Sequence, residues 1–158
     1  MNESTKIPVE SPGVNVAVVK KDPDGWKFLV LQWSAEDAYG GYWGFVNGGK
    51  QGGETVAQVV VRKLKVELGL NPLSMWATEY VVHFYEPVYD KVLILPLIVA
   101  VVDPESQVKL SPEVSSFRWL PPGKARHLVS WKNLERMIEE ITDELEIFPA
   151  RNWVQITA

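Results

Sequence analysis

The stretch 48–70 contains the residues whose types and spacing could do chemistry. Gly48 and Gly49 lack side chains, so their backbone can approach a phosphate group closely or form a tight turn. Glu54 and Glu67 supply carboxylates, which Mg²⁺ accepts as ligands together with phosphate oxygens and water. These residue types suit work on a phosphorylated substrate, although a glycine turn before a packing helix would also use them.

Local signals predict a helix over residues 55–68. Thr55 as N-cap and Gln58 three residues later fit a capping box. Gly69 suits the left-handed residue that commonly ends a helix. The apolar side chains repeat at helical spacing and would face a core: Ala57, Val60, Val61, Leu64 and Leu68. These features alone are explained by an amphipathic helix that packs on the core.

The spacing of the whole segment resembles the Nudix box, the signature of hydrolases that cleave nucleoside diphosphates linked to another group. That pattern reads Gly, five residues, Glu, seven residues, Arg-Glu, an aliphatic residue, any residue, Glu-Glu, any residue, Gly and an aliphatic residue. Five matching positions are Gly48, Glu54, Arg62, Glu67 and Gly69. A packing helix after a glycine loop does not account for all five matches.

Two acidic positions of the box are not acidic in this chain. The Glu after the arginine is Lys63, and the first Glu of the pair is Val66. On a helix, positions 63, 66 and 67 share one face, so three carboxylates there would form a metal-binding ridge. This chain presents an ammonium, a valine and one carboxylate. We expect this combination to weaken the binding of a divalent ion.

The resemblance implies roles for the box residues that remain. Glu67 is the catalytic and metal-ligand position if the chain is active, with Mg²⁺ or Mn²⁺ as cofactor. As an alternative, Glu67 is a solvated helix residue paired with Lys63, and the chain needs no metal ion. Glu54, Arg62 and Gly69 are structural positions of the box.

Ligands missing from the box could come from elsewhere in the chain. The resemblance allows a displaced metal site made of Glu54, Glu67 and Glu86. Glu113 is a further candidate, because it precedes a strand that resembles a late strand of the family. Each of these acids could equally be a polar turn residue.

The resemblance also places phosphate-binding residues at the glycine loop. The backbone of Gly48 and Gly49 would approach the phosphate, and Lys50 occupies a position that is basic in many family members. Lys63 could meet phosphate charge directly, in place of a metal ion. A solvated Lys50 and a simple tight turn are the alternatives.

Aromatic residues precede the box. Tyr39 and Tyr42 flank two glycines, and in a loop of this kind they could stack on a base. Their alternative role is to anchor the loop by packing.

Composition restricts the class of protein. A chain of 158 residues is large enough for one domain with its own core. A net charge of −4 argues against a partner that is a nucleic-acid polymer, and the absence of cysteine removes disulfides and zinc–thiolate sites. No apolar run is long enough to span a membrane. We therefore expect a cytoplasmic protein whose partner is a nucleotide or nucleotide-like small molecule, and a homodimer stays open.

Hydrophobic patterns predict a mixed α/β fold. Strands are expected at 14–20, 27–33, 42–47, 75–85, 91–102 and 115–120, and helices at 55–68, 121–129 and 130–144. Helices would then cover both faces of a mixed sheet. This matches the α/β/α sandwich that the resemblance implies. Residues 1–12 are expected to be a flexible tail and residues 13–158 a single Nudix domain, with Pro96 at a bulge or a sheet edge.

Three functions remain open at this point. The favoured one is a protein related to nucleoside diphosphate-X pyrophosphohydrolases, with weak or lost metal-dependent hydrolysis and retained nucleotide binding. The others are an active Nudix hydrolase with non-standard metal ligands and a non-catalytic interaction domain. The segment 130–133 is similar to part of bacterial dATP and dihydroneopterin triphosphate pyrophosphohydrolases, which is a much less specific resemblance than the box.

Overall fold

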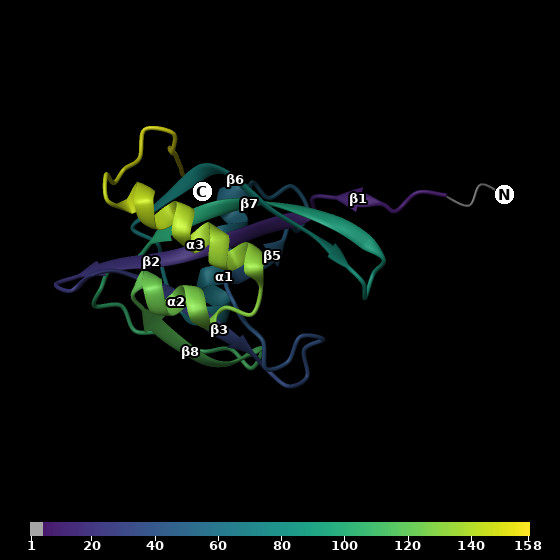
Figure 1. Cartoon of the computed structure of the whole chain (residues 1–158), viewed down its shortest axis with the longest axis horizontal. Coiled ribbons are helices and arrows are strands. Elements are labelled where there is room, and N and C mark those ends of the chain that lie inside the picture. Colours follow the sequence, from purple (N-terminus) through teal and green to yellow (C-terminus); the bar gives the residue numbers. More distant parts are fainter. Residues whose placement is uncertain (1–4) are drawn as a thin grey trace.

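The computed structural model describes residues 5–158, and these form one mixed sheet with helices on both faces (Figure 1). The sheet has nine strands in the described part of the chain, and its main path runs β4-β3-β2-β7-β6-β9. Beside this path, β1 pairs with β7, β5 with β2 and β8 with β3. The strands are β1 Val9–Glu10, β2 Gly13–Asp22, β3 Gly25–Trp33, β4 Trp43–Gly44, β5 Val46–Gly49, β6 Ser74–Glu86, β7 Lys91–Val101, β8 Val114–Leu120 and β9 Val154–Ile156. The helices are α1 Val56–Leu68, α2 Pro122–Leu128 and α3 Lys132–Leu145.

Alternation along β2 divides the core into two parts. Val14, Val16 and Val18 face the side that α1 covers, where they join one apolar cluster. Ala17 and Val19 face the other side and join a second cluster with α3. Each face of the sheet therefore has its own core, which confirms the predicted α/β/α sandwich with a mixed sheet.

Pro96 lies inside the sheet, in the strand between β2 and β6, and not at an edge. The expected bulge is present in the partner strand: Ala77 pairs with Ile98 and Val81 with Pro96, so the three β6 residues between them oppose one residue of β7. The Thr78 hydroxyl donates to the carbonyl of Leu97 at 2.8 Å. This irregular pairing accommodates a residue that has no N–H to donate.

Three further details differ from the sequence expectation. The strand expected at 42–47 is divided into β4 and β5, because the two halves pair with different strands. Part of the expected tail forms β1, which pairs in parallel with β7, while residues 1–4 lie outside the described residues. At the other end of the chain, β9 pairs with β6.

The ends of α1 are those that its sequence predicts. The N–H of Gln58 donates to Thr55 Oγ1 at 3.2 Å, and the N–H of Thr55 donates to Gln58 Oε1 at 2.9 Å, which completes the capping box. Gly69 has φ 65°, the left-handed conformation, and its N–H donates to the carbonyl of Lys65 at 3.0 Å.

An ion pair joins the glycine loop to α1. Arg62 donates from Nε to Glu54 Oε2 at 2.8 Å and from Nη2 to Glu54 Oε1 at 2.9 Å. The same Nη2 donates to the carbonyl of Gly49 at 2.7 Å. The hydrogen bonds from Arg62 hold the pKa of Glu54 below its ordinary value, against the opposing effect of burial. This pair fixes where the loop lies relative to the helix.

Among residues 5–158, no helix has both the length and the apolar character needed to cross a membrane.

The left-handed conformation of Gly69 predicts that alanine substitutions at two glycines change stability by different amounts. Gly69→Ala should lower the free energy of unfolding by about 1–2 kcal/mol, because a residue with a Cβ is strained at positive φ. Gly53 does not have a positive φ, and a Cβ there would have no atom within 4 Å, so Gly53→Ala is the matched control and should be neutral or slightly stabilising. Denaturant unfolding of both variants measures this. Equal losses in the two would contradict the assigned cap.

The ion pair at the loop predicts a pH-dependent contribution to stability. The folded pKa of Glu54 lies below its ordinary value of 4.5, so the pair stabilises the fold above that pH and loses its effect as the pH falls through the folded pKa. Glu54→Gln should therefore lower the melting temperature at pH 7, and the difference from the parent should shrink below pH ~4.5. Glu36→Gln, at an exposed loop position, is the control. A difference independent of pH would count against the ion pair as its cause.

Candidate nucleotide pocket and box helix

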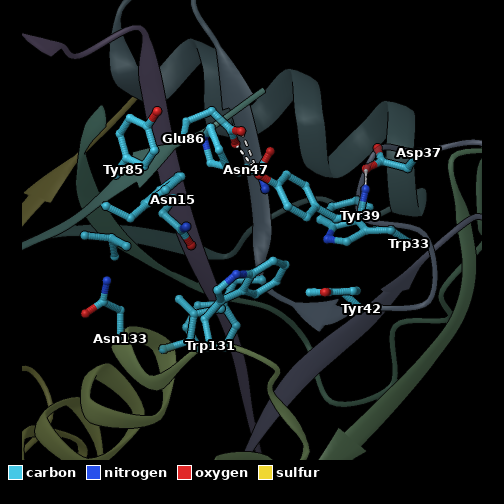
Figure 2. Close-up of a pocket in the computed structure, with 15 residues that line it drawn as sticks. Asn15, Trp33, Asp37, Tyr39, Tyr42, Asn47, Tyr85, Glu86, Trp131 and Asn133 are labelled. Atoms are coloured by element: carbon cyan, nitrogen blue, oxygen red, sulfur yellow. Dashed lines mark hydrogen bonds between the residues drawn. The ribbon is translucent and has the colours of Figure 1, made fainter. Parts of the chain in front are cut away.

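A cavity of about 430 Å³ lies on the α3 side of the sheet (Figure 2). We call it the aromatic pocket and define it by six of its lining residues: Asn15, Tyr39, Tyr42, Asn47, Glu86 and Trp131. These come from β2, the loop before β4, β5, the end of β6 and the segment before α3. The fold thus brings together residues more than a hundred positions apart.

Trp131 is placed in the pocket by contacts of its neighbours. Ser130, which precedes Trp131, makes two hydrogen bonds with the backbone of Trp43. The N–H of Trp43 donates to Ser130 Oγ, and the N–H of Ser130 donates to the Trp43 carbonyl, each at 2.9 Å. Gly44 leaves room for the indole, because a Cβ at Gly44 would lie 3.0 Å from Trp131 Cζ3. Asn133 Nδ2 donates to the carbonyl of His83 at 2.7 Å and ties the start of α3 to β6.

Tyr39 is anchored by the buried carboxylate of Glu86. Its hydroxyl lies 2.7 Å from both carboxylate oxygens, and the N–H of Val88 donates to Glu86 Oε1 at 2.8 Å. Burial, followed by the hydrogen bond to Glu86, raises the pKa of Tyr39 to about 12, so the phenol stays a donor near neutral pH. The expected stacking residue is therefore held by its hydroxyl, as Figure 2 shows.

Tyr42 and Trp131 pack together in the lining of the pocket. Their ring centroids are 5.3 Å apart at an interplanar angle of 42°. Tyr39 lies edge-on to Trp131, with centroids 5.7 Å apart and an angle of 79°. Tyr42 is 47% exposed, so part of its surface is open to a ligand. The three rings thus pack on one another and together form an aromatic wall of the pocket.

Glu67 of the box is buried and already has partners. It is only 5% exposed, so its description as a solvated residue is wrong, although the predicted pairing with Lys63 is present. Lys63 Nζ lies 3.1 Å from Glu67 Oε1, and the Ser111 hydroxyl donates to Oε2 at 2.5 Å. Burial alone would raise the pKa of Glu67, but the hydrogen bonds from Ser111 and Lys63 outweigh it and the pKa is lowered.

Glu113 adds a second carboxyl group beside Glu67. A hydrogen bond to the Glu67 carboxylate, together with its negative charge, raises the pKa of Glu113. The two carboxyls thus differ in their affinity for a proton, and Glu67 is the one that stays ionised. The donors to this ionised carboxylate are Lys63 Nζ at Oε1 and the Ser111 hydroxyl at Oε2.

Lys63 also packs against the first glycine of the box. A Cβ on Gly48 would lie 2.5 Å from Lys63 Cγ and 2.8 Å from its Cδ, so only glycine leaves room for this stem. Asn47, the preceding residue, lines the pocket on the opposite face of β5. One short strand therefore borders both the aromatic pocket and the Lys63–Glu67 pair.

The other residues expected at a phosphate have backbone partners in the protein. The N–H of Lys50 donates to the carbonyl of Pro12 at 3.0 Å, and the carbonyl of Gly49 accepts from Arg62. The Lys50 side chain is exposed. Lys50 can therefore meet a phosphate through its ammonium but not through its amide.

The predicted metal ligands do not fit a shared ion. Glu54 is held by Arg62, Glu67 by Lys63 and Ser111, and Glu86 by Tyr39. In the described range 5–158, no three His, Cys, Asp or Glu side chains form a group that could hold a metal ion. Val66, at the second altered box position, is 63% exposed and has no oxygen to offer.

Sequence reasoning did not select Asn15 or Trp131 as site residues. Asn15 is the one polar residue in the run Val14 to Val19, and a polar side chain in an otherwise apolar strand is a usable signal. Trp131 belongs to the segment 130–133, but nothing in the sequence places that segment against β4.

Comparisons with known proteins agree with the box. The NUDIX domain family matches residues 11–141 of this chain. Curated protein sequences give no match. Many solved structures have a similar fold, and three of them are described next. The Ap4A hydrolase of C. elegans, in a binary complex, is 18% identical over 85% of this chain and 97% of that chain, with TM-score 0.73. The NUDIX domain of Shewanella oneidensis NrtR, complexed with ADP ribose, is 16% identical over 90% of each chain, with TM-score 0.71. The E. coli dihydroneopterin triphosphate pyrophosphohydrolase is 21% identical over 86% of this chain and 99% of that chain, with TM-score 0.65.

At these identities the structures establish the fold, and the family match covers most of the chain together with its altered box. On this basis, the chain belongs to the Nudix family.

Proposed function

We propose that this chain binds a nucleotide or nucleotide-like molecule in the aromatic pocket and that its box has weak or no metal-dependent pyrophosphohydrolase activity. The observation that carries the proposal is the pairing of Glu67, whose two carboxylate oxygens meet Lys63 and Ser111. The family's hydrolases use divalent ions such as Mg²⁺ or Mn²⁺, and the residues present here do not suit one.

Electrostatics explains why this arrangement disfavours a divalent ion. A metal ion on Glu67 would have to displace the ammonium at 3.1 Å or accept repulsion from it. The neighbouring positions offer no compensation, because Lys63 and Val66 replace two carboxylates. Mg²⁺ gives up its water reluctantly and is usually held by at least one free carboxylate. Glu67 is not free.

The pocket supports the binding half of the proposal. It offers aromatic faces from Tyr42 and Trp131 beside polar side chains, the usual composition of a small-molecule site. Structural relatives crystallised with ADP ribose, or described as Ap4A hydrolases, show that this fold accommodates such molecules in other proteins. Since β5 has the pocket on one face and Lys63 on the other, a bound molecule must extend past this strand for its phosphate to meet Lys63.

A nucleotide panel with and without Mn²⁺ separates the candidate functions. We expect a thermal shift with at least one nucleotide in EDTA, little change on adding Mn²⁺, and little or no phosphate release. Trp131→Ala should weaken binding about tenfold through lost stacking, whereas Trp119→Ala, outside the pocket, should not. Lys63→Ala should weaken binding of the nucleotide but not of its nucleoside, because only the former carries the charge.

Two results would contradict this proposal. Binding and turnover that both require Mn²⁺ would indicate an active hydrolase with non-standard ligands. The absence of a thermal shift with every nucleotide, with or without metal, would leave the non-catalytic interaction domain.

Restoring the two carboxylates should restore a response to metal. Without metal, Lys63→Glu with Val66→Glu should melt below the parent, because Glu67 stays buried without its cation. Added Mn²⁺ should raise the melting temperature of the double variant by about 3 °C or more and leave the parent unchanged. Thermal denaturation at a series of Mn²⁺ concentrations measures both effects.

Two controls accompany the double variant. Lys65→Glu makes the same charge change as Lys63→Glu, but at an exposed position of α1, and should not create a metal response. Val66→Glu alone changes an exposed side chain and keeps Lys63, so it should fold and stay unresponsive. A metal response in the parent or in Val66→Glu would show that Lys63 does not exclude the ion.

A further inference from the structure

Asn15 is a buried polar side chain whose oxygen has no partner. It is 6% exposed, and among the described residues its Oδ1 is one of two buried side-chain atoms without a hydrogen-bond partner. Leaving a buried polar group unpaired costs about 1–3 kcal/mol. Such an atom needs an explanation, because buried polar groups in folded proteins are nearly always paired.

The position of Asn15 gives it access to the pocket. Along β2 its side chain lies on the same face as Ala17 and Val19, the face covered by α3. Asn47 is its register partner on the antiparallel strand β5, so both amides lie on one face and both line the pocket. Figure 2 shows the Asn15 amide directed toward the Trp131 ring. Asn15 therefore forms part of the pocket wall, and a ligand would reach its buried oxygen through a small shift of the amide toward the cavity.

The surroundings of this oxygen restrict the chemistry of its partner. An amide oxygen needs an N–H or O–H donor, and the nitrogen of the same amide is itself a donor. Tyr42 and Trp131 favour a planar ring, while Phe45 and Leu134 make the lining beside it apolar. A planar ring with an amino group beside a ring nitrogen offers the matching donor and acceptor, as adenine does to asparagine.

We infer that Asn15 selects a base whose edge carries an amino group next to a ring nitrogen, with Asn15 Oδ1 accepting from the amino group. The inference rests on the proposed nucleotide binding and names its ligand class. A ring with a carbonyl in place of the amino group would present an oxygen to an oxygen. Where such a ring presents two adjacent acceptors on this edge, the Asn15 oxygen would have no donor, and the lost hydrogen bond lowers the affinity for that ring.

The test compares two nucleotides that differ at this edge. ADP carries the amino group, and IDP carries a carbonyl in its place. Isothermal titration without metal should give the parent protein a preference for ADP of at least about tenfold. The preference is measured on the parent, so it does not depend on whether a variant folds.

Substitution of Asn15 provides a second measurement. Asn15→Leu should reduce the ADP preference to less than about twofold and raise the melting temperature of the free protein, because it removes an unpaired buried polar group. Asn15→Ser, which is too short to reach the ligand, should also lose the preference and covers the case in which the leucine does not fit. A purely structural role for the amide would instead make Asn15→Leu less stable and leave the preference intact.

The outcomes separate this inference from the function on which it rests. Equal binding of ADP and IDP, both weakened by Trp131→Ala, would overturn the role of Asn15 and leave nucleotide binding in place. Tighter binding of IDP would overturn it as well. Binding of neither ADP nor IDP at millimolar concentration, while another nucleotide of the panel binds, would overturn the role of Asn15 alone. The absence of binding by every nucleotide of the panel would overturn both proposals.

Discussion

The proposed behaviour of the altered box depends on the ion pair between Lys63 and Glu67. A buried carboxylate is tolerated only when other groups replace the water it has lost. Here the ammonium of Lys63 and the hydroxyl of Ser111 replace it, at 3.1 and 2.5 Å. The lysine also fills the space over Gly48 with its methylene groups. Lys63 is thus part of the packing of the loop on the helix, and the first glycine of the box is needed to admit it.

The box on α1 and the aromatic pocket differ in which of their features are present. The frame of the box is intact, since Arg62 still joins Glu54 to the glycine loop and Gly69 still ends α1. The metal-binding face of that frame is replaced by an internal ion pair. The aromatic pocket on the other side of β5 has an aromatic lining and an unpaired buried acceptor. The proposed function, ligand binding with weak or no cleavage, would explain why the box and the pocket differ in this way.

The sequence could predict what local interactions determine. The caps of α1 depend on residues three or four positions apart, so Thr55 and Gln58 were sufficient to predict them. The surroundings of the site residues depend on contacts between residues far apart in the chain. From the sequence alone, Glu67 can be interpreted as a solvated helix residue paired with Lys63 one turn away. The sequence does not show that Ser111, 44 positions later, donates to its second oxygen.

Pro96 and Trp131 illustrate the same limit. Whether a proline lies at an edge or at a bulge depends on how many residues its partner strand supplies, and β6 supplies the extra ones. Trp131 enters the pocket because Gly44, far away in the chain, leaves room for its ring. Neither fact can be obtained from spacing along one segment. The family pattern located the box, but only the contacts around it show that each oxygen of Glu67 already has a donor, from Lys63 and from Ser111.

The most direct test of this account is a crystal soaked in Mn²⁺ together with a bound nucleotide, examined by anomalous scattering. We expect Lys63 Nζ to keep its contact with Glu67 and no manganese peak to appear on that face of α1. A manganese ion coordinated by Glu67, with Lys63 displaced and the nucleotide cleaved, would contradict it.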